Sequence, residues 1–396
     1  MNESLKENIR AAARTYFPLT RDIRRHLHRN PEPSFSEFET SAFLKAKLEE
    51  AGIPIAGTWV KTGFMVELKG AKPGKTVTLR ADMDALPIQE SNNTEYASRN
   101  AGWMHACGHD VHSACQMGAI FILNELREHW SGTIRFVFQP GEEVLPGGAS
   151  LMLREGMFEQ FPPGNLIAQH VFPELPAGHV GFRPGQYMAS TDELHITIHG
   201  KGGHGALPHT TKDPVLAAAQ VIVALQQIAS RKTKPGVHTV LSIGKVIANG
   251  ATNVIPAEVQ LQGTFRTLDE EWRAEAHQLI DSIVQNTCLA SGVRAEIEIR
   301  KGYPALSNDV ELTKKCKAAA EDFLGSDRVH DLDIRMTAED FAWFAQRYPA
   351  CFYRLGTASP DGKFTSGVHT NTFDIDEDAM LTGSGLMAWL AISESH

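Results

Sequence analysis

Residues 76–84, with the sequence TVTLRADMD, join a short apolar run to two aspartates. The run at 76–79 has the length and composition of a buried strand, and Asp82 and Asp84 follow where that strand ends. Around it, we expect further strands at 64–68, 133–138 and 166–168 and helices at 37–51 and 111–129. Helices that alternate with short apolar strands predict an α/β fold with a mixed, mostly parallel sheet flanked by helices.

The middle of the chain follows a different pattern. Its elements are predicted as strands at 193–198, 238–246, 258–266 and 294–300 and helices at 213–230 and 269–290. The order β-α-β-β-α-β is that of the ferredoxin-like α+β unit, which is a complete small domain. We therefore expect a discontinuous domain, residues 1–187 and 301–396, with an inserted domain at residues 188–300. Its second part should contain helices at 310–324 and 338–347, a strand at 351–355 and a helix from about residue 376.

Composition and charge limit the class of protein. The 396 residues are 42% hydrophobic and 21% charged, which is typical of a globular protein of two domains. A formal charge of −9 argues against nucleic acid or anionic membrane as a partner. No apolar run approaches the roughly 18–20 residues of a membrane helix, and the N-terminus has no signal pattern. Five cysteines are too few for a disulfide framework, so we expect a cytoplasmic protein with free thiols.

Two glycine-rich stretches imitate nucleotide-binding motifs. Residues 200–205, GKGGHG, match the dinucleotide pattern, but the next predicted helix begins only at residue 213, too late to receive a pyrophosphate. Residues 70–76, GAKPGKT, are one residue shorter than a P-loop and precede a strand where a helix is required. We interpret the second stretch as a turn and assign neither to nucleotide binding.

Acidic and histidine side chains follow several of the predicted strands. Glu142 and Glu143 come after the strand at 133–138, and His170 comes after the strand at 166–168. A loop after the strand at 351–355 leads to His369. Because ligands of open α/β sheets bind outside the carboxyl ends of the strands, we expect these side chains to converge with Asp82 and Asp84.

The stretch HACGHD, residues 105–110, adds a thiol and an imidazole to this edge. Cys107 and His109 are two residues apart, so in an extended backbone they point the same way. Sulfur and nitrogen ligands suit zinc or a neighbouring divalent metal. A single Cys-x-His or a lone histidine is usually structural. It is the recurrence at several strand ends that predicts a metal site.

Together these segments resemble the signature of the co-catalytic metal-dependent amidohydrolases, a family that includes aminoacylases and carboxypeptidase G-like peptidases. The resemblance is to the branch of hippurate hydrolase and the auxin-amino-acid conjugate hydrolases. It is carried by RADMDALP (80–87), MHACGHD (104–110), QPGEE (139–143), GGHGA (202–206), NVIP (253–256) and GTFR (263–266). It implies a zinc-peptidase-like catalytic domain, with the inserted domain serving as a lid and for dimerisation.

The resemblance also implies roles for single residues. Glu142 would be the general base, and Asp84 would orient a ligand. His204, from the inserted domain of this chain or of a partner subunit, would stabilise the oxyanion, while Asn253 and Arg266 would anchor a substrate carboxylate. The metal ligands would be Cys107, His109, Glu143, His170 and His369. Cys107 would take over part of the bridging work that a carboxylate does in distant relatives.

We therefore expect an enzyme that hydrolyses the amide bond of N-acyl amino acids, of the hippurate or N-acetyl-amino-acid type. It would use two divalent metal ions, a metal-bound hydroxide and Glu142. Zinc or manganese is the first expectation, with cobalt or nickel as alternatives. The expected assembly is a homodimer, and the expected partner a small N-acyl amino acid or short peptide.

Two other functions stay open at the level of sequence. One is a dipeptidase or carboxypeptidase with the same dinuclear site, although no acidic partner for a free α-amino group is apparent in the sequence. The other is a non-catalytic metal-binding protein, which would have no use for Glu142 beside the ligand Glu143. The acyl group, the amino acid and the native metal are not determined by the sequence.

Overall fold

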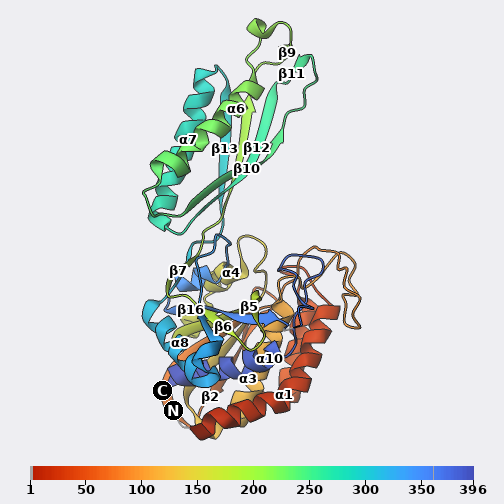
Figure 1. Ribbon diagram of the computed structural model, residues 1–396, viewed down its shortest axis with the longest axis vertical. Helices are drawn as coiled ribbons and strands as arrows, with labels where there is room; N and C mark the ends of the chain where they lie inside the picture. The colour runs from red at the N-terminus through yellow and green to blue at the C-terminus, as the bar shows by residue number, and fades with distance from the viewer. Residues whose placement is uncertain (1–2, 360) are drawn as a thin grey trace. The chain divides into compact units, whose positions relative to one another are not determined.

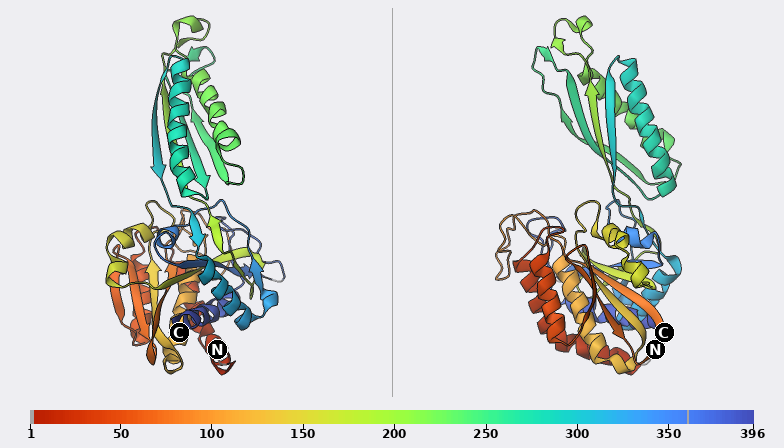
Figure 2. Two further views of the ribbon diagram at one scale, coloured as in Figure 1. Left: turned by 90° about the vertical axis from the view of Figure 1, so that its left-hand side faces the viewer. Right: turned by 180° about the vertical axis from the view of Figure 1, so that it is seen from behind.

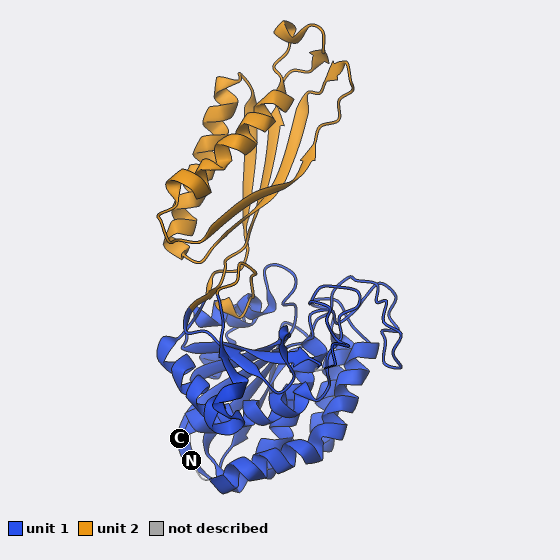
Figure 3. Cartoon of the chain, viewed as in Figure 1, with its two compact units in different colours: residues 1–185, 307–333, 343–396 blue, residues 186–306, 334–342 orange. Residues whose placement is uncertain are grey.

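The computed structural model describes residues 3–359 and 361–396, and the chain divides into two compact units (Figure 3). Unit 1 comprises Met1–Gly185, Ser307–Asp333 and Trp343–His396. Unit 2 comprises Gln186–Leu306 and Ile334–Ala342. The lid and dimerisation roles expected of the inserted domain stay predictions.

Unit 1 is built on an eight-stranded sheet of order β1-β2-β4-β3-β5-β16-β6-β15 (Figure 1). Strand β3 is parallel to both of its neighbours, β4 and β5, and β5 is parallel to β16, whereas β2 is antiparallel to β1 and β4. The predicted mixed, mostly parallel sheet is thus confirmed. The strands are β1 (Ile55–Trp59), β2 (Gly63–Lys69), β3 (Lys72–Asp82), β4 (Ser131–Gln139), β5 (Asn165–Pro176), β6 (Val180–Phe182), β15 (Val329–Asp331) and β16 (Ala350–Ala358).

Helices α3 and α10 of unit 1 pack on the sheet and on each other, α1 packs across both, and α8 lies against α10 and β16. Every residue of 109–123 in α3 is buried, because that helix is enclosed by the sheet on one side and by α1 and α10 on the others. The helices are α1 (Glu3–Arg29), α2 (Phe38–Glu50), α3 (His109–Glu125), α4 (Gly148–Arg154), α5 (Met157–Gln160), α8 (Val310–Leu324) and α10 (Ala379–Ser395), with short turns η1 (Arg127–His129) and η4 (Ser326–Arg328).

Unit 2 has a four-stranded antiparallel sheet of order β10-β12-β8-β13, with α6 and α7 together on one face (Figure 2). This is the predicted ferredoxin-like arrangement. Its elements are β8 (Asp192–His199), α6 (Pro214–Leu225), η3 (Ile228–Lys232), β10 (Thr239–Ile247), β12 (Glu258–Thr267), α7 (Glu270–Ala290) and β13 (Arg294–Lys301). Strands β9 (Gly203–His204) and β11 (Val254–Ile255) form a separate antiparallel pair, and the turn η2 (Pro208–Thr210) follows β9. Strands β7 (Gly185–Met188) and β14 (Leu306–Asn308) form another pair, where the chain passes from one unit to the other.

The helix predicted at 338–347 is wrong: the structure has only α9, Ala342–Ala345. The Glu339 carboxylate accepts a hydrogen bond from the Phe341 amide at 3.0 Å just before α9, so the helix begins later than predicted. Neither glycine-rich stretch has the structure of a nucleotide-binding motif, but the turn predicted at 70–76 is shorter than expected, because only Gly70 and Ala71 lie between β2 and β3. The α-helix that follows residues 200–205 begins only at Pro214, and strand β3 begins at Lys72, within the second stretch.

Within the described part of the chain, no helix combines the length and the apolar character needed to cross a lipid bilayer.

Candidate metal centre

The carboxyl ends of the central strands of unit 1 place the acidic side chains. Asp82 is the last residue of β3 and Asp84 follows two residues later, while Glu142 and Glu143 come just after the end of β4. His170 lies inside β5, which runs on to Pro176, so the strand predicted at 166–168 was too short. Since β3 is hydrogen-bonded to β4 and to β5, these side chains meet at one edge of the sheet.

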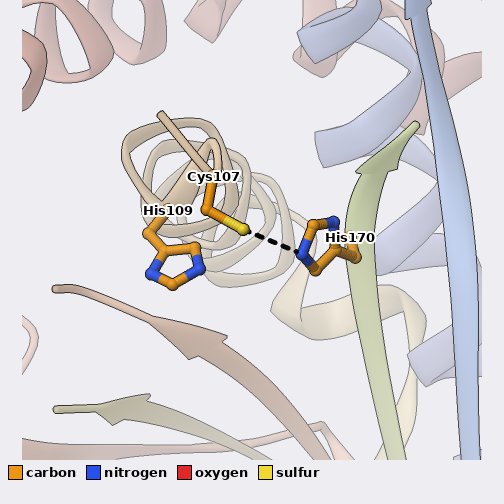
Figure 4. Close-up of side chains that lie close together, drawn as sticks. All are labelled: Cys107, His109 and His170. Atoms are coloured by element: carbon orange, nitrogen blue, oxygen red, sulfur yellow. Dashed lines mark hydrogen bonds between the residues drawn. The ribbon is translucent and has the colours of Figure 1, made fainter. Parts of the chain in front are cut away.

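The loop before α3 brings a thiol to the same edge. Gly108 has φ +79°, and a Cβ there would lie 2.6 Å from Val171, so only glycine lets this loop approach β5. The Cys107 Sγ lies 3.5 Å from His170 Nε2, and Figure 4 shows the sulfur directed toward that ring. His369 Nε2 lies 3.3 Å from the same sulfur.

Glu143 closes the cluster from the other side. Its Oε1 lies 3.4 Å from His369 Nε2 and 3.8 Å from His109 Nε2. The five predicted metal ligands therefore lie together. They form two overlapping groups, in each of which the ligand atoms all lie within 4.8 Å of one another and Cys107 is shared. The groups are Cys107, His109 and His170, and Cys107, Glu143 and His369.

Neighbouring acceptors fix how the two buried imidazoles face the cluster. His109 Nδ1 lies 3.2 Å from Asp84 Oδ1, and His170 Nδ1 lies 2.8 Å from the Val171 carbonyl oxygen. With Nδ1 donating, each ring directs its Nε2 at the cluster, which is the nitrogen that would bind a metal ion. Among the described residues, His109 Nε2 and Glu143 Oε1 are buried without a hydrogen-bond partner.

The charges of the cluster favour a cation. Burial lowers the pKa of His109, but Asp82 and Asp84 outweigh burial and raise that pKa to about 10. Burial, and then the charges of Glu143 and Glu142, raise the pKa of the Cys107 thiol well above its usual range. Carboxylates thus raise the pKa of the imidazole and add to the effect of burial on the pKa of the thiol, and a bound divalent cation would offset their charge.

The residues of the cluster fit divalent metal ions by both their donor types and their spacing. The donor set of one thiolate, imidazole nitrogens and a carboxylate suits zinc and its neighbours. The separations of 3.3–3.8 Å between donor atoms agree with ligands placed around a common ion at about 2.0–2.3 Å. The role of each residue as a ligand remains a proposal.

A supporting pair, His112 and Asp82, was not assigned a role from sequence. His112 Nδ1 donates to Asp82 Oδ1 at 2.6 Å, and its Nε2 accepts from the Val171 amide at 2.9 Å. Asp82 also accepts from Arg80 at 2.6 Å. His112 therefore holds the backbone next to His170. Its position three residues after His109, on the same side of α3, was the available signal.

The predicted general base lies beside the ligands. Glu142 is buried, and its carboxylate belongs to a group with His109 and Glu143 whose ligand atoms all lie within 4.8 Å. Asp84 holds this segment, since its Oδ2 accepts from the Glu143 amide at 2.9 Å and from the Ser34 hydroxyl at 2.6 Å. Asp84 thus contacts both His109 and the loop that carries Glu142.

The three site residues predicted in the inserted domain all belong to unit 2. His204 lies in β9, and the Asn253 carbonyl accepts from the Gly205 amide at 2.8 Å, so these two segments are neighbours. Arg266 lies toward the other end of β12 and donates to the Met336 carbonyl at 3.1 Å. The structure thus brings His204 near Asn253 but not near Arg266, and the roles of all three stay predictions.

Comparison with known proteins gives consistent matches. The model of peptidase family M20/M25/M40 matches residues 78–392. An N-acetyl-L-cysteine deacetylase of Bacillus subtilis is 40% identical over 362 residues, which cover 91% of this chain and 85% of the relative. An N-acyl-L-amino acid amidohydrolase of Geobacillus stearothermophilus is 44% identical over 285 residues, covering 72% and 76%. The crystal structure of the Bacillus subtilis YXEP protein, described as a dinuclear metal-binding peptidase, is 33% identical with a TM-score of 0.82 and covers 96% of this chain and 98% of that one.

Proposed function

This chain belongs to peptidase family M20/M25/M40, and we propose that it is a metal-dependent amidohydrolase that removes the acyl group from N-acyl amino acids. The observation that carries the proposal is the cluster of Cys107, His109, Glu143, His170 and His369, with Glu142 beside it. Two relatives at 40% and 44% identity, named for deacylation of acyl amino acids, support this substrate class.

In this proposal, residues of unit 1 carry out the proton transfers of the reaction. Water must attack the amide carbonyl carbon, the C–N bond must break, and the leaving nitrogen must gain a proton. Glu142 accepts the proton of the attacking water and returns it to that nitrogen, which is worth about 10²- to 10⁴-fold in rate. Asp84 holds the amide of Glu143 and so keeps Glu142 at the cluster. Divalent cations bound at the cluster would supply Lewis acidity to the carbonyl and to water.

We propose zinc or manganese as the metal and the hippurate and auxin-conjugate branch as the nearer group of relatives. The central place of the Cys107 thiol, shared by both ligand groups, supports the branch assignment. The expected cytoplasmic location also remains a proposal.

We also propose a homodimer that forms through unit 2. Val223 on α6 and Leu289 on α7 are 73% and 75% exposed, and the apolar hollow between these helices has a volume of about 650 Å³. An exposed apolar patch of this kind is typical of a protein interface. Light scattering of the purified protein measures the mass directly, and a monomer at working concentration would contradict the proposal.

A panel of substrates separates this function from a dipeptidase or carboxypeptidase. The measurement is kcat/KM on benzoyl-glycine, acetyl-amino acids and unblocked dipeptides, with the metal content determined on the same sample. We expect acyl amino acids to be preferred by at least about tenfold, because an uncharged acyl nitrogen needs no acidic partner. A preference for unblocked dipeptides would favour the peptidase. Bound metal together with no turnover of any substrate in the panel would favour a metal-binding protein.

A further inference from the structure

The Glu37 side chain is buried, and it accepts hydrogen bonds from the backbone next to the candidate site. Its Oε1 accepts from the amides of Phe35 and Gly141, each at 2.8 Å, and its Oε2 accepts from the Thr62 hydroxyl at 2.8 Å. All three donors are neutral. Burial, and then the charge of Asp84, raise the pKa of Glu37 to about 7. An acid is held here at a cost in stability, which indicates a function beyond packing.

The loop that carries Glu142 is held by carboxylates on both sides. Glu37 accepts a hydrogen bond from the amide of Gly141, and Asp84 accepts one from the amide of Glu143. Glu142 therefore lies between two peptide groups that are held in place. The contact is also steric. Gly141 has φ +59°, and a Cβ there would lie 2.4 Å from the Phe35 ring, which leaves the two segments in direct contact.

Capping of helix α2 does not explain the Glu37 carboxylate. Glu37 is the residue before α2, but its side chain makes no capping hydrogen bond. Glu32 does that work instead, because its carboxylate accepts from the amides of Glu39 at 3.2 Å and Thr40 at 2.7 Å. Two nearby glutamates thus accept hydrogen bonds from backbone amides. Glu32 caps helix α2, and Glu37 holds the loop that carries Glu142.

We propose that Glu37 is a positioning residue, which fixes the Gly141 amide and thereby aims the Glu142 carboxylate at the reacting water and the leaving nitrogen. This inference rests on the proposed function for the role of Glu142. The hydrogen bond itself stands independently of that role. Misplacement of a catalytic group by about 1 Å costs on the order of 10²-fold in rate, so the positioning should be visible in kcat.

The first test measures backbone amide exchange in the purified, metal-loaded protein. Overlapping peptides that begin on either side of Gly141 resolve its amide by hydrogen–deuterium exchange. Glu37→Ala should speed exchange at Gly141 by at least about tenfold, because the acceptor is lost. Glu32→Ala is the matched control and should speed exchange at Thr40 but not at Gly141. Unchanged exchange at Gly141 in Glu37→Ala overturns the proposal whether or not a substrate is known.

The second test compares kcat, KM and metal content. Glu37→Ala should lower kcat at least about tenfold, with KM and metal content within about twofold of wild type. Glu37→Gln, whose amide oxygen can still accept from Gly141, should restore most of kcat. The shorter Glu37→Asp should not restore it, and it serves in place of alanine should that variant fold poorly.

Two outcomes of the second test overturn the positioning role. One is that Glu37→Ala lowers kcat no more than Glu32→Ala does, when the two variants lose the same amount of thermal stability. The other is loss of bound metal, which would mean that Glu37 acts through Glu143. If the wild-type protein hydrolyses none of the acyl amino acids, the proposed function fails, and the exchange experiment still decides the contact.

Discussion

At the scale of single residues, the proposed mechanism assigns metal binding and proton transfer to different side chains of the candidate site. The five expected ligands direct sulfur, nitrogen or oxygen atoms at one another, and Glu142 lies beside them. Asp84, His112 and Glu37 contact the backbone or the far side of the ligand rings. The chemistry therefore depends on a small set of buried hydrogen bonds, and each can be removed separately.

Glu142→Gln tests the general base. The amide has nearly the same shape but cannot take a proton from water, so kcat should fall by at least about a hundredfold while metal content stays unchanged. Metal analysis and steady-state kinetics on one preparation provide the comparison. Undiminished turnover would remove Glu142 from the mechanism.

His112→Ala tests the support beneath His170. Without the imidazole, the Val171 amide and Asp82 lose their partner, and groups behind a metal ligand typically contribute about 10–100-fold to metal affinity. Competition with a chromogenic chelator should show a loss in that range. His195→Ala, in strand β8 of unit 2 where the half-buried ring lies 3.0 Å from Glu193, is the control and should bind metal as wild type does. Equal affinity of the two variants would contradict the supporting role.

At the scale of elements, strand ends were predictable and one helix was not. The apolar run at 76–79 predicted strand β3, which extends from Lys72 to Asp82, because the composition of a buried strand is distinctive. His170 was expected after its strand but lies within β5. Of the helix predicted at 338–347, only the four residues of α9, Ala342–Ala345, are helical. The contact of Glu37 with Gly141 joins residues 104 positions apart, and no periodic pattern predicts such a contact.

Strand β8 and helix α7 of unit 2 are joined by a buried ion-pair network. Asp192 accepts from Arg273 and from His277, and Arg273 also donates to the Thr191 and Gly302 carbonyls. Burial raises the pKa of Asp192, but the hydrogen bonds of His277 and Arg273 outweigh burial and lower it. The network therefore ties both chain segments that enter unit 2 to α7.

The lowered pKa gives this network a definite dependence on pH. Because the folded pKa of Asp192 lies below the unfolded value, its contribution is fully present above the unfolded pKa, near 4, and is lost as the pH falls through the folded pKa. Asp192→Asn should destabilise unit 2 by about 3 kcal/mol at neutral pH. The difference from wild type should shrink on acidification. Thermal unfolding at pH 7 and pH 3 measures both effects, and a difference that grows in acid would contradict the assignment.

At the scale of the whole molecule, the two units have separate cores. The five expected metal ligands lie within unit 1, and unit 2 has its own hydrophobic core around its four-stranded sheet. The order of elements in the middle of the chain was enough to predict the inserted fold. What each unit does for the other was implied only by the resemblance, because a pattern of hydrophobic residues carries no information on assembly.

Removal of metal should therefore act on one unit. A chelator leaves the carboxylates and the thiol of unit 1 without a cation, so the unfolding transition of unit 1 should move to lower temperature while that of unit 2 stays in place. Differential scanning calorimetry provides the measurement, and tryptophan fluorescence of Trp272→Phe, whose remaining tryptophans all lie in unit 1, assigns the transition of unit 1. Equal shifts of both transitions would mean that the units do not respond separately.

The central claim is that five side chains from distant parts of the chain bind two divalent cations through a shared thiolate. Anomalous diffraction from crystals of the metal-loaded protein tests it most directly. We predict two peaks that flank the Cys107 sulfur, one of them within about 2.3 Å of it for a zinc–sulfur bond, with His170 and His369 facing them. Peaks found only away from Cys107, with either histidine turned elsewhere, would contradict the claim.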